Sequence, residues 1–165
     1  MRHIAVIKLR YIGDTLLVTP VFAALRKAFP NSTLAAVVNQ GTEAVLWNHP
    51  AIDEIIPINR TASLLRYAGD LQRIRRKHFD LAIDLTGADR SALIAFWSGA
   101  PVRLGYQGGG VVRSRILYNR LIAAHEGAMH KVDYHLAAIE AMGVPVSERA
   151  PRLFLSPEEM AKTAE

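Results

Sequence analysis

Apolar runs that alternate with segments of helical spacing are the feature that most constrains how this chain folds. Five runs are typical of buried strands: residues 3–9, 33–38, 54–58, 81–85 and 102–106. The segments that follow them have helical spacing: residues 17–28, 42–48, 62–77, 91–97 and 130–142. Strands that alternate with helices imply βαβ units and a parallel sheet with right-handed crossovers. The sequence therefore predicts an α/β domain with a doubly wound parallel sheet.

Size and charge narrow the class of protein. The 165 residues suffice for one ordinary domain, and a composition of 50% hydrophobic and 21% charged residues is that of a folded chain. The net charge of +5 favours anionic partners such as phosphates, nucleic acid or an acidic membrane surface. The N-terminal apolar stretch is too short for a signal peptide, and no uncharged apolar run could span a bilayer. We therefore expect a soluble or peripheral protein.

Polar residues gather where strands of such a sheet end, which is where its ligands bind. Gly13 and Asp14 follow the first strand, and Thr86 to Arg90 follow the fourth. Asp14 has two interpretations, a helix N-cap or a reacting carboxylate, and aspartate is a favoured cap. Position 17 lacks the Glu or Gln of a capping box, and Thr19-Pro20 offers a competing helix start. Gly13 permits a close approach of the backbone to a ligand.

The cations also have two interpretations each. Alternation puts Lys8 and Arg10 on the same side of the first strand, where both could extend to solvent from the strand end or form ion pairs. In the alternative interpretation, Arg10 holds an anion or helps to keep Asp14 ionised. Residues 90–125 hold no acidic residue, so their arginines belong to a solvated loop or to an anion site: Arg90, Arg103, Arg113, Arg115 and Arg120. The basic run in residues 66–77 is typical of a solvated helix surface, with a membrane contact as the alternative.

Metal and cofactor sites are not indicated. The chain has no cysteine, and its six histidines include no HExxH pattern. There is no Asp-x-Asp pair, Walker loop or GxGxxG motif. We therefore expect no metal and no cofactor.

One stretch resembles a known family. KLRYIGDTLLVTPVFAALRKAFP, residues 8–30, is similar to the N-terminal signature of ADP-heptose:lipopolysaccharide heptosyltransferases, glycosyltransferase family 9. The shared pattern is a lysine-containing strand, Gly-Asp, two aliphatic residues, a proline, then Leu-Arg and Phe-Pro. FDLAIDLTGADRSALIAFWSGAPVRLGY and HKVDYHLAAIEAMGV extend the similarity over nearly the whole chain. The first motif is specific because its spacing is rigid, and the other two are supportive.

The resemblance implies a Rossmann-like domain that forms the N-terminal half of a GT-B glycosyltransferase. Residues 1–150 would be the acceptor-binding domain, and residues 151–165 would begin the linker to a C-terminal donor domain, with a capping box at Ser156 to Glu159. The family's proposed catalytic base matches Asp14. The expected enzyme is an inverting heptosyltransferase that moves a heptose from ADP-heptose to the lipopolysaccharide inner core. The chain alone would then lack turnover.

The resemblance also suggests partners. The acceptor would be an acidic, lipid-anchored sugar, and ADP-heptose would be a substrate held by the other domain. The expected acceptor-binding residues are Lys8, Arg10, Gly13, Thr86, Gly87, Asp89, Arg90, Arg113 and Arg115. We expect a cytoplasmic protein, with a peripheral contact with the inner membrane left open. The alternative function is a non-catalytic basic α/β module that binds nucleotide or nucleic acid, although no recognition helix or aromatic platform is present.

Overall fold

A six-stranded parallel sheet forms the centre of the computed structural model, which describes residues 1–59, 63–108, 116–124, 127 and 129–156. The strand order is β3-β2-β1-β4-β5-β6, and each neighbouring pair is parallel. The strands are β1 (His3–Lys8), β2 (Thr33–Asn39), β3 (Glu54–Ile58), β4 (Leu81–Asp84), β5 (Val102–Tyr106) and β6 (Arg120–Ile122). This order is that of a doubly wound Rossmann sheet, which confirms the predicted fold class.

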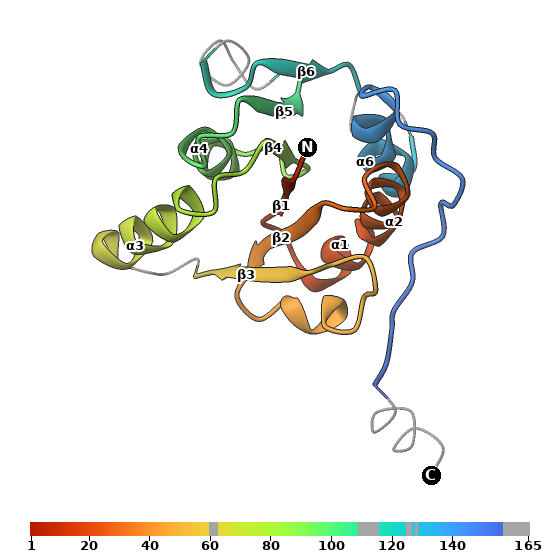
Figure 1. The fold of residues 1–165 in the computed structure, drawn as a ribbon, viewed down its shortest axis with the longest axis horizontal. Helices are drawn as coiled ribbons and strands as arrows, with labels where there is room; N and C mark the ends of the chain where they lie inside the picture. Colours follow the sequence, from red (N-terminus) through yellow and green to blue (C-terminus); the bar gives the residue numbers. More distant parts are fainter. Residues whose placement is uncertain (60–62, 109–115, 125–126, 128, 157–165) are drawn as a thin grey trace.

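Helices cover both faces of the sheet (Figure 1). They are α1 (Ile12–Leu16), α2 (Thr19–Ala28), α3 (Leu64–Arg75), α4 (Asp89–Trp97), α6 (Lys131–Glu140) and the short 3₁₀ helix η1 (Glu43–Leu46). Helices α3 and α4 pack together on one face, and α2 and α6 pack together on the other. No helix among the described residues is long and apolar enough to cross a membrane.

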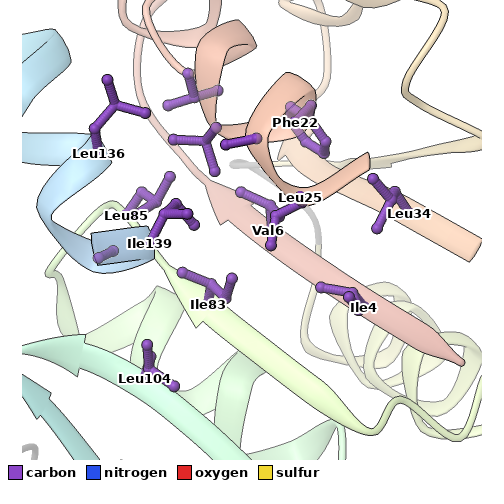
Figure 2. Packing of buried hydrophobic residues seen from close by; sticks show 14 of the residues in the cluster. Ile4, Val6, Phe22, Leu25, Leu34, Ile83, Leu85, Leu104, Leu136 and Ile139 are labelled. Carbon is purple, nitrogen blue, oxygen red and sulfur yellow. The ribbon is translucent and has the colours of Figure 1, made fainter. Parts of the chain in front are cut away.

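Alternating side chains of the strands build two hydrophobic cores. In β1, Ile4 and Val6 point toward α2 and α6, whereas Ala5 and Ile7 point toward α3 and α4. Figure 2 shows the first core, in which Val6 and Ile83 from the sheet meet Leu25 of α2 and Ile139 of α6. Because a parallel sheet is buried on both faces, its strands have continuous apolar sequences, and this is the signal that the sequence carried.

Three elements differ from the sequence prediction. The strand β6 was not predicted, because three residues (RLI) are too short for a periodic signal. The helix expected over residues 17–28 is preceded by a separate helix α1, and α2 begins at Thr19 with Pro20 in its first turn. Residues 42–48 contain a 3₁₀ turn and no α-helix.

The chain after α6 crosses the outside of α2 without regular secondary structure up to Ser156 (Figure 1). The backbone N–H of Arg152 donates to Thr19 Oγ1 at 3.1 Å, and the Phe154 ring lies edge-on to His49 at 4.9 Å. Most of the capping box expected at residues 156–159 lies outside the described residues.

Candidate functional site

A hollow of about 210 Å³ opens at the carboxyl edge of the sheet, beside the ends of β1 and β4. The strand order reverses between these two strands, and ligands of open α/β sheets bind at such a switch point. The lining residues come from three strand ends and from the start of α4: Leu9, Arg10, Tyr11, Asn39, Thr86, Ala88, Arg90 and Ser91.

Side chains from neighbouring strand ends hold the walls of this hollow in place. Thr86 Oγ1 accepts the N–H of Leu9 at 2.8 Å, and Asn39 Nδ2 donates to the carbonyl of Arg10 at 3.0 Å. Asn39 is buried, and its Oδ1 has no hydrogen-bond partner among the described residues. A buried oxygen without a partner is costly, so Asn39 Oδ1 is available to accept a hydrogen bond from a bound molecule. The sequence analysis missed Asn39, whose only signal was its place at a strand end.

Asp14 lies in the first turn of α1, next to the hollow. The N-cap residue of α1 is Tyr11, and Asp14 is the third helical residue, so the N-cap interpretation was wrong. The helix begins earlier than expected because Tyr11 is extended and its carbonyl accepts the N–H and the hydroxyl of Thr15. Asp14 is half-buried, and a carboxylate in this turn faces the positive end of the helix.

Gly13 is not required by the packing of α1. An added Cβ would meet nothing within 4 Å, and its backbone φ is not in the left-handed region. Gly87 is different, because its φ of +69° suits glycine in the turn after β4. The fold therefore explains Gly87 but leaves Gly13 open to a role in ligand approach.

Lys8 lies beneath the edge of the sheet and not in the hollow. Its side chain is 3% exposed, and its Nζ donates to the carbonyl of Leu85 at 3.0 Å and to His135 Nε2 at 3.1 Å. Burial lowers the pKa of Lys8 to about 8, while the negative charge of Asp14 acts in the opposite direction. A direct contact with an acceptor, as the sequence suggested, is incompatible with this burial. Lys8 instead supplies a buried cation whose charge interacts with that of Asp14.

His135 of α6 completes a buried polar chain. Because Nε2 accepts from the Lys8 ammonium, the ring proton sits on Nδ1, which faces Tyr106 Oη at 3.5 Å. The Tyr106 hydroxyl donates to the carbonyl of Tyr134 at 2.9 Å. Burial and the charge of Lys8 lower the pKa of His135 to about 3, so the ring is neutral. Nothing in the sequence predicted this role of His135, because it depends on the contact between β1 and α6.

Asp84 is buried at the end of β4 and organises the turn that holds Thr86 and Gly87. Its Oδ1 accepts both backbone N–H groups, at 2.7 and 3.3 Å, and its Oδ2 accepts the Tyr118 hydroxyl at 2.6 Å. Burial raises the pKa of Asp84, and these hydrogen bonds oppose that rise. The role of Asp84 is structural, since its oxygens point into the protein.

The arginines expected at the site differ in what they contact. Arg10 is exposed and lines the hollow, and its guanidinium makes no hydrogen bond or ion pair within the described part of the chain. Arg90 also lines the hollow, but it donates to the carbonyl of Asn59 at 2.6 Å and stacks on Tyr67 at 4.8 Å. Arg103 donates to the carbonyls of Leu117 and Ala100, so its role is structural.

The remaining expected residues lie near the hollow or outside the described residues. Gly13 and Asp14 lie in α1, Gly87 lies in the turn after β4, and Asp89 is the first residue of α4. None of these four residues lines the hollow. Arg113 and Arg115 lie outside the described residues. No group of three His, Asp or Glu side chains within the described ranges could hold a metal ion.

Comparisons with known proteins agree on one family and one fold. The sequence model described as "Glycosyltransferase family 9 (heptosyltransferase)" matches residues 70–165. Lipopolysaccharide heptosyltransferase 3 of Escherichia coli (strain K12) is 24% identical over 145 residues, which are 82% of this chain and 41% of that protein. The chain thus spans less than half the length of this curated relative.

Two solved structures share the fold over 99% of the chain. The glycosyl transferase family 9 protein from Veillonella parvula DSM 2008 superimposes with a TM-score of 0.85 at 23% identity, over 47% of its own length. The ADP-heptose lipopolysaccharide heptosyltransferase II of E. coli superimposes with a TM-score of 0.79 at 22% identity, over 50% of its length.

Proposed function

The chain belongs to glycosyltransferase family 9, the heptosyltransferase family, and we propose that it is the acceptor-binding half of an enzyme of lipopolysaccharide core synthesis. The proposed reaction moves a heptose from ADP-heptose to the inner core, with inversion at the anomeric carbon. The observation that carries this proposal is the position of Asp14. This half-buried carboxylate follows β1 at the switch point of the sheet, three residues after Tyr11, which lines the hollow, and its charge interacts with the buried ammonium of Lys8.

Asp14 is the general base in this proposal. The acceptor hydroxyl gives its proton to the Asp14 carboxylate while its oxygen attacks the anomeric carbon of the heptose. The bond from that carbon to the phosphate oxygen breaks, and ADP leaves with the electron pair on the opposite face. A single displacement of this kind inverts the anomeric centre. The Lys8 ammonium stays in place, held by Leu85 and His135, and balances the charge of the carboxylate.

The hollow supplies the contacts for an acidic sugar acceptor. Arg10 presents an exposed guanidinium that suits bidentate binding of a carboxylate or phosphate. Asn39 Oδ1 accepts a hydrogen bond from a hydroxyl of the sugar. Gly13 has no side chain, so the acceptor can approach the start of α1 closely. The wall formed by the chain after β4 includes Thr86 and Arg90. The adjoining residues Gly87 and Asp89 hold this wall in place. Arg113 and Arg115 remain predictions for the same acceptor.

The donor is expected elsewhere. A volume of about 210 Å³ lies below the roughly 300–1,000 Å³ typical of small-molecule sites, so the hollow fits one sugar and not a whole nucleotide sugar. We propose that ADP-heptose binds to a second domain, as the GT-B architecture implies, and meets the acceptor over Asp14. The proposed enzyme needs no metal or cofactor from this chain.

Replacing the carboxylate of Asp14 tests this proposal. In the enzyme that contains this chain, Asp14→Asn should lower kcat roughly 10²–10⁴-fold, which is the usual contribution of a positioned general base. The melting temperature should change little, since Asp14 caps no helix. Glu140→Gln serves as the control, because it removes one exposed carboxylate at the far end of α6. A folded Asp14→Asn enzyme with the turnover of the Glu140→Gln control would disprove the proposal.

A further inference from the structure

Helix α4 carries a second apolar face that no described segment covers. Its inner side packs on the sheet through Ser91, Ala92, Ile94 and Ala95, which are buried. On its outer side, Leu93, Phe96 and Trp97 are 47, 41 and 50% exposed. These three positions are spaced i, i+3 and i+4, so they form one continuous stripe along the helix. Large side chains in such a stripe indicate a contact surface and not isolated exposed residues.

Guanidinium groups border this stripe. A hollow of about 570 Å³ between α3 and α4 is lined by Phe96 and Trp97, by Arg75 and Arg103, and by Gln72 and Gly99. The Arg103 guanidinium lies over the Phe96 ring at 5.4 Å, and the Arg75 side chain packs against Gly99, where a Cβ would clash with it. Two arginines and two aromatic rings therefore share one shallow surface.

The neighbouring helix α3 adds positive charge that the described residues do not balance. Of its cations, Arg73 pairs with Asp70 at 3.6 Å, and Lys77, just beyond the helix, pairs with Glu54 at 2.6 Å. Arg66, Arg75 and Arg76 are exposed and make no ion pair with any described residue. The face is thus both apolar and cationic.

We propose that this outer face of α3 and α4, which we call the docking face, binds to the surface of an anionic lipid bilayer. Tryptophan and phenylalanine prefer the boundary between headgroups and acyl chains, and the exposed Arg75 beside them suits a lipid phosphate. The charge is complementary to an anionic surface. Helix α4 begins at the hollow, with Arg90 in its first turn, and ends at Trp97. When α4 is docked, the hollow therefore lies beside the membrane. The binding of vesicles by this face can be tested independently of the proposed reaction.

The two tryptophans of the chain allow a direct test. Trp97 lies on the docking face, whereas Trp47 follows η1 and is 63% exposed. Trp47→Phe leaves Trp97 as the sole indole fluorophore, and Trp97→Phe leaves Trp47. When vesicles of phosphatidylcholine and phosphatidylglycerol are added, the emission of Trp97 should shift to shorter wavelength and that of Trp47 should not. An unshifted Trp97, or an equal shift of both residues, would overturn the proposal.

Vesicle sedimentation tests the charge requirement. Arg75→Gln with Arg76→Gln should weaken binding to phosphatidylglycerol vesicles about fivefold for each charge removed. The control, Arg149→Gln with Arg152→Gln, removes the same charge from exposed residues after α6 and should have a much smaller effect. Far-UV circular dichroism checks that both variants are folded. Equal losses in both variants, or equal binding to vesicles of phosphatidylcholine alone, would overturn the proposal and point to general charge or to a protein partner.

Discussion

At the scale of single residues, a buried lysine and a neutral histidine define the chemistry of the sheet edge. The Lys8 ammonium is removed from water at the end of the central strand, and its two hydrogen-bond acceptors are a backbone carbonyl and His135 Nε2. A protonated His135 would repel Lys8 and could not accept this hydrogen bond. The fold thus requires His135 to stay neutral for as long as Lys8 is charged, and this requirement has a measurable pH dependence.

We predict that His135 makes the fold sensitive to acid. Burial lowers the pKa of His135 to about 3 in the folded chain, whereas the ordinary value for histidine is 6.5. Between pH 3 and pH 6.5, therefore, His135 binds a proton in the unfolded chain but not in the folded chain. The free energy of unfolding should therefore fall as the pH is lowered from about 6.5 toward 3, by up to about 1.4 kcal/mol per pH unit. His135→Gln keeps an acceptor for Lys8 without a titrating group, and it should reduce this slope. Urea denaturation at several pH values measures the effect.

His3→Gln is the matched control for this prediction, because His3 is exposed and its contact is with the carbonyl of Lys77. The slope should fall less in His3→Gln than in His135→Gln. If His135→Gln lowers the slope no more than this control does, the coupling of His135 to folding is wrong.

At the scale of elements, the Tyr118 side chain connects β5 with the end of the neighbouring strand β4. The Tyr118 ring lies against Gly105, and its hydroxyl reaches across to Asp84 at the end of β4. The approach is possible only because position 105 has no side chain. Two strands and the turn that carries Thr86 therefore depend on one glycine.

Two glycine substitutions should have opposite effects on stability. A Cβ at Gly105 would come within 2.3 Å of the Tyr118 ring, so Gly105→Ala should destabilise the fold by roughly 1–3 kcal/mol through overpacking. Gly69 lies inside α3 with nothing within 4 Å of an added Cβ, so Gly69→Ala should stabilise the fold by roughly 0.5–1 kcal/mol. Urea midpoints measure both changes. A neutral Gly105→Ala would show that Tyr118 is free to move away.

Whether a feature could be predicted from the sequence depended on whether a local pattern of residues or a contact with a distant part of the chain determines it. The strands of residues 54–58 and 102–106 have the bounds that were predicted, because each is a short run rich in apolar residues. Helix α1 was missed because it is five residues long and its N-cap is Tyr11, which is not a favoured capping residue. The acceptor role given to Lys8 failed because its burial depends on α6, more than a hundred residues away in the chain. Asn39 and His135 needed the assembled fold for the same reason.

At the scale of the whole molecule, the sheet separates two kinds of surface. The carboxyl edge holds Asp14 and the small hollow. Helices α3 and α4 form a separate flank (Figure 1), and exposed aromatic and basic residues lie on it. The docking face contributes to the net charge of +5 through Arg75, which lines the hollow between α3 and α4 and makes no ion pair within the described ranges. This distribution favours one oriented contact with an anionic surface over the diffuse binding expected of a nucleic-acid module.

We predict that this chain by itself binds ADP-heptose only weakly. The hollow at the carboxyl edge has a volume of about 210 Å³. Arg10 is the one exposed guanidinium in its described lining that has no partner among the described residues, so this hollow cannot both neutralise a diphosphate and enclose an adenosine. Isothermal titration calorimetry should therefore show no saturation at micromolar donor. The E. coli ADP-heptose lipopolysaccharide heptosyltransferase II, of which this chain covers 50%, provides the positive control under the same conditions. Micromolar binding of ADP-heptose to residues 1–165 would mean that the donor site lies in this domain, and the proposed division between acceptor and donor halves would be wrong.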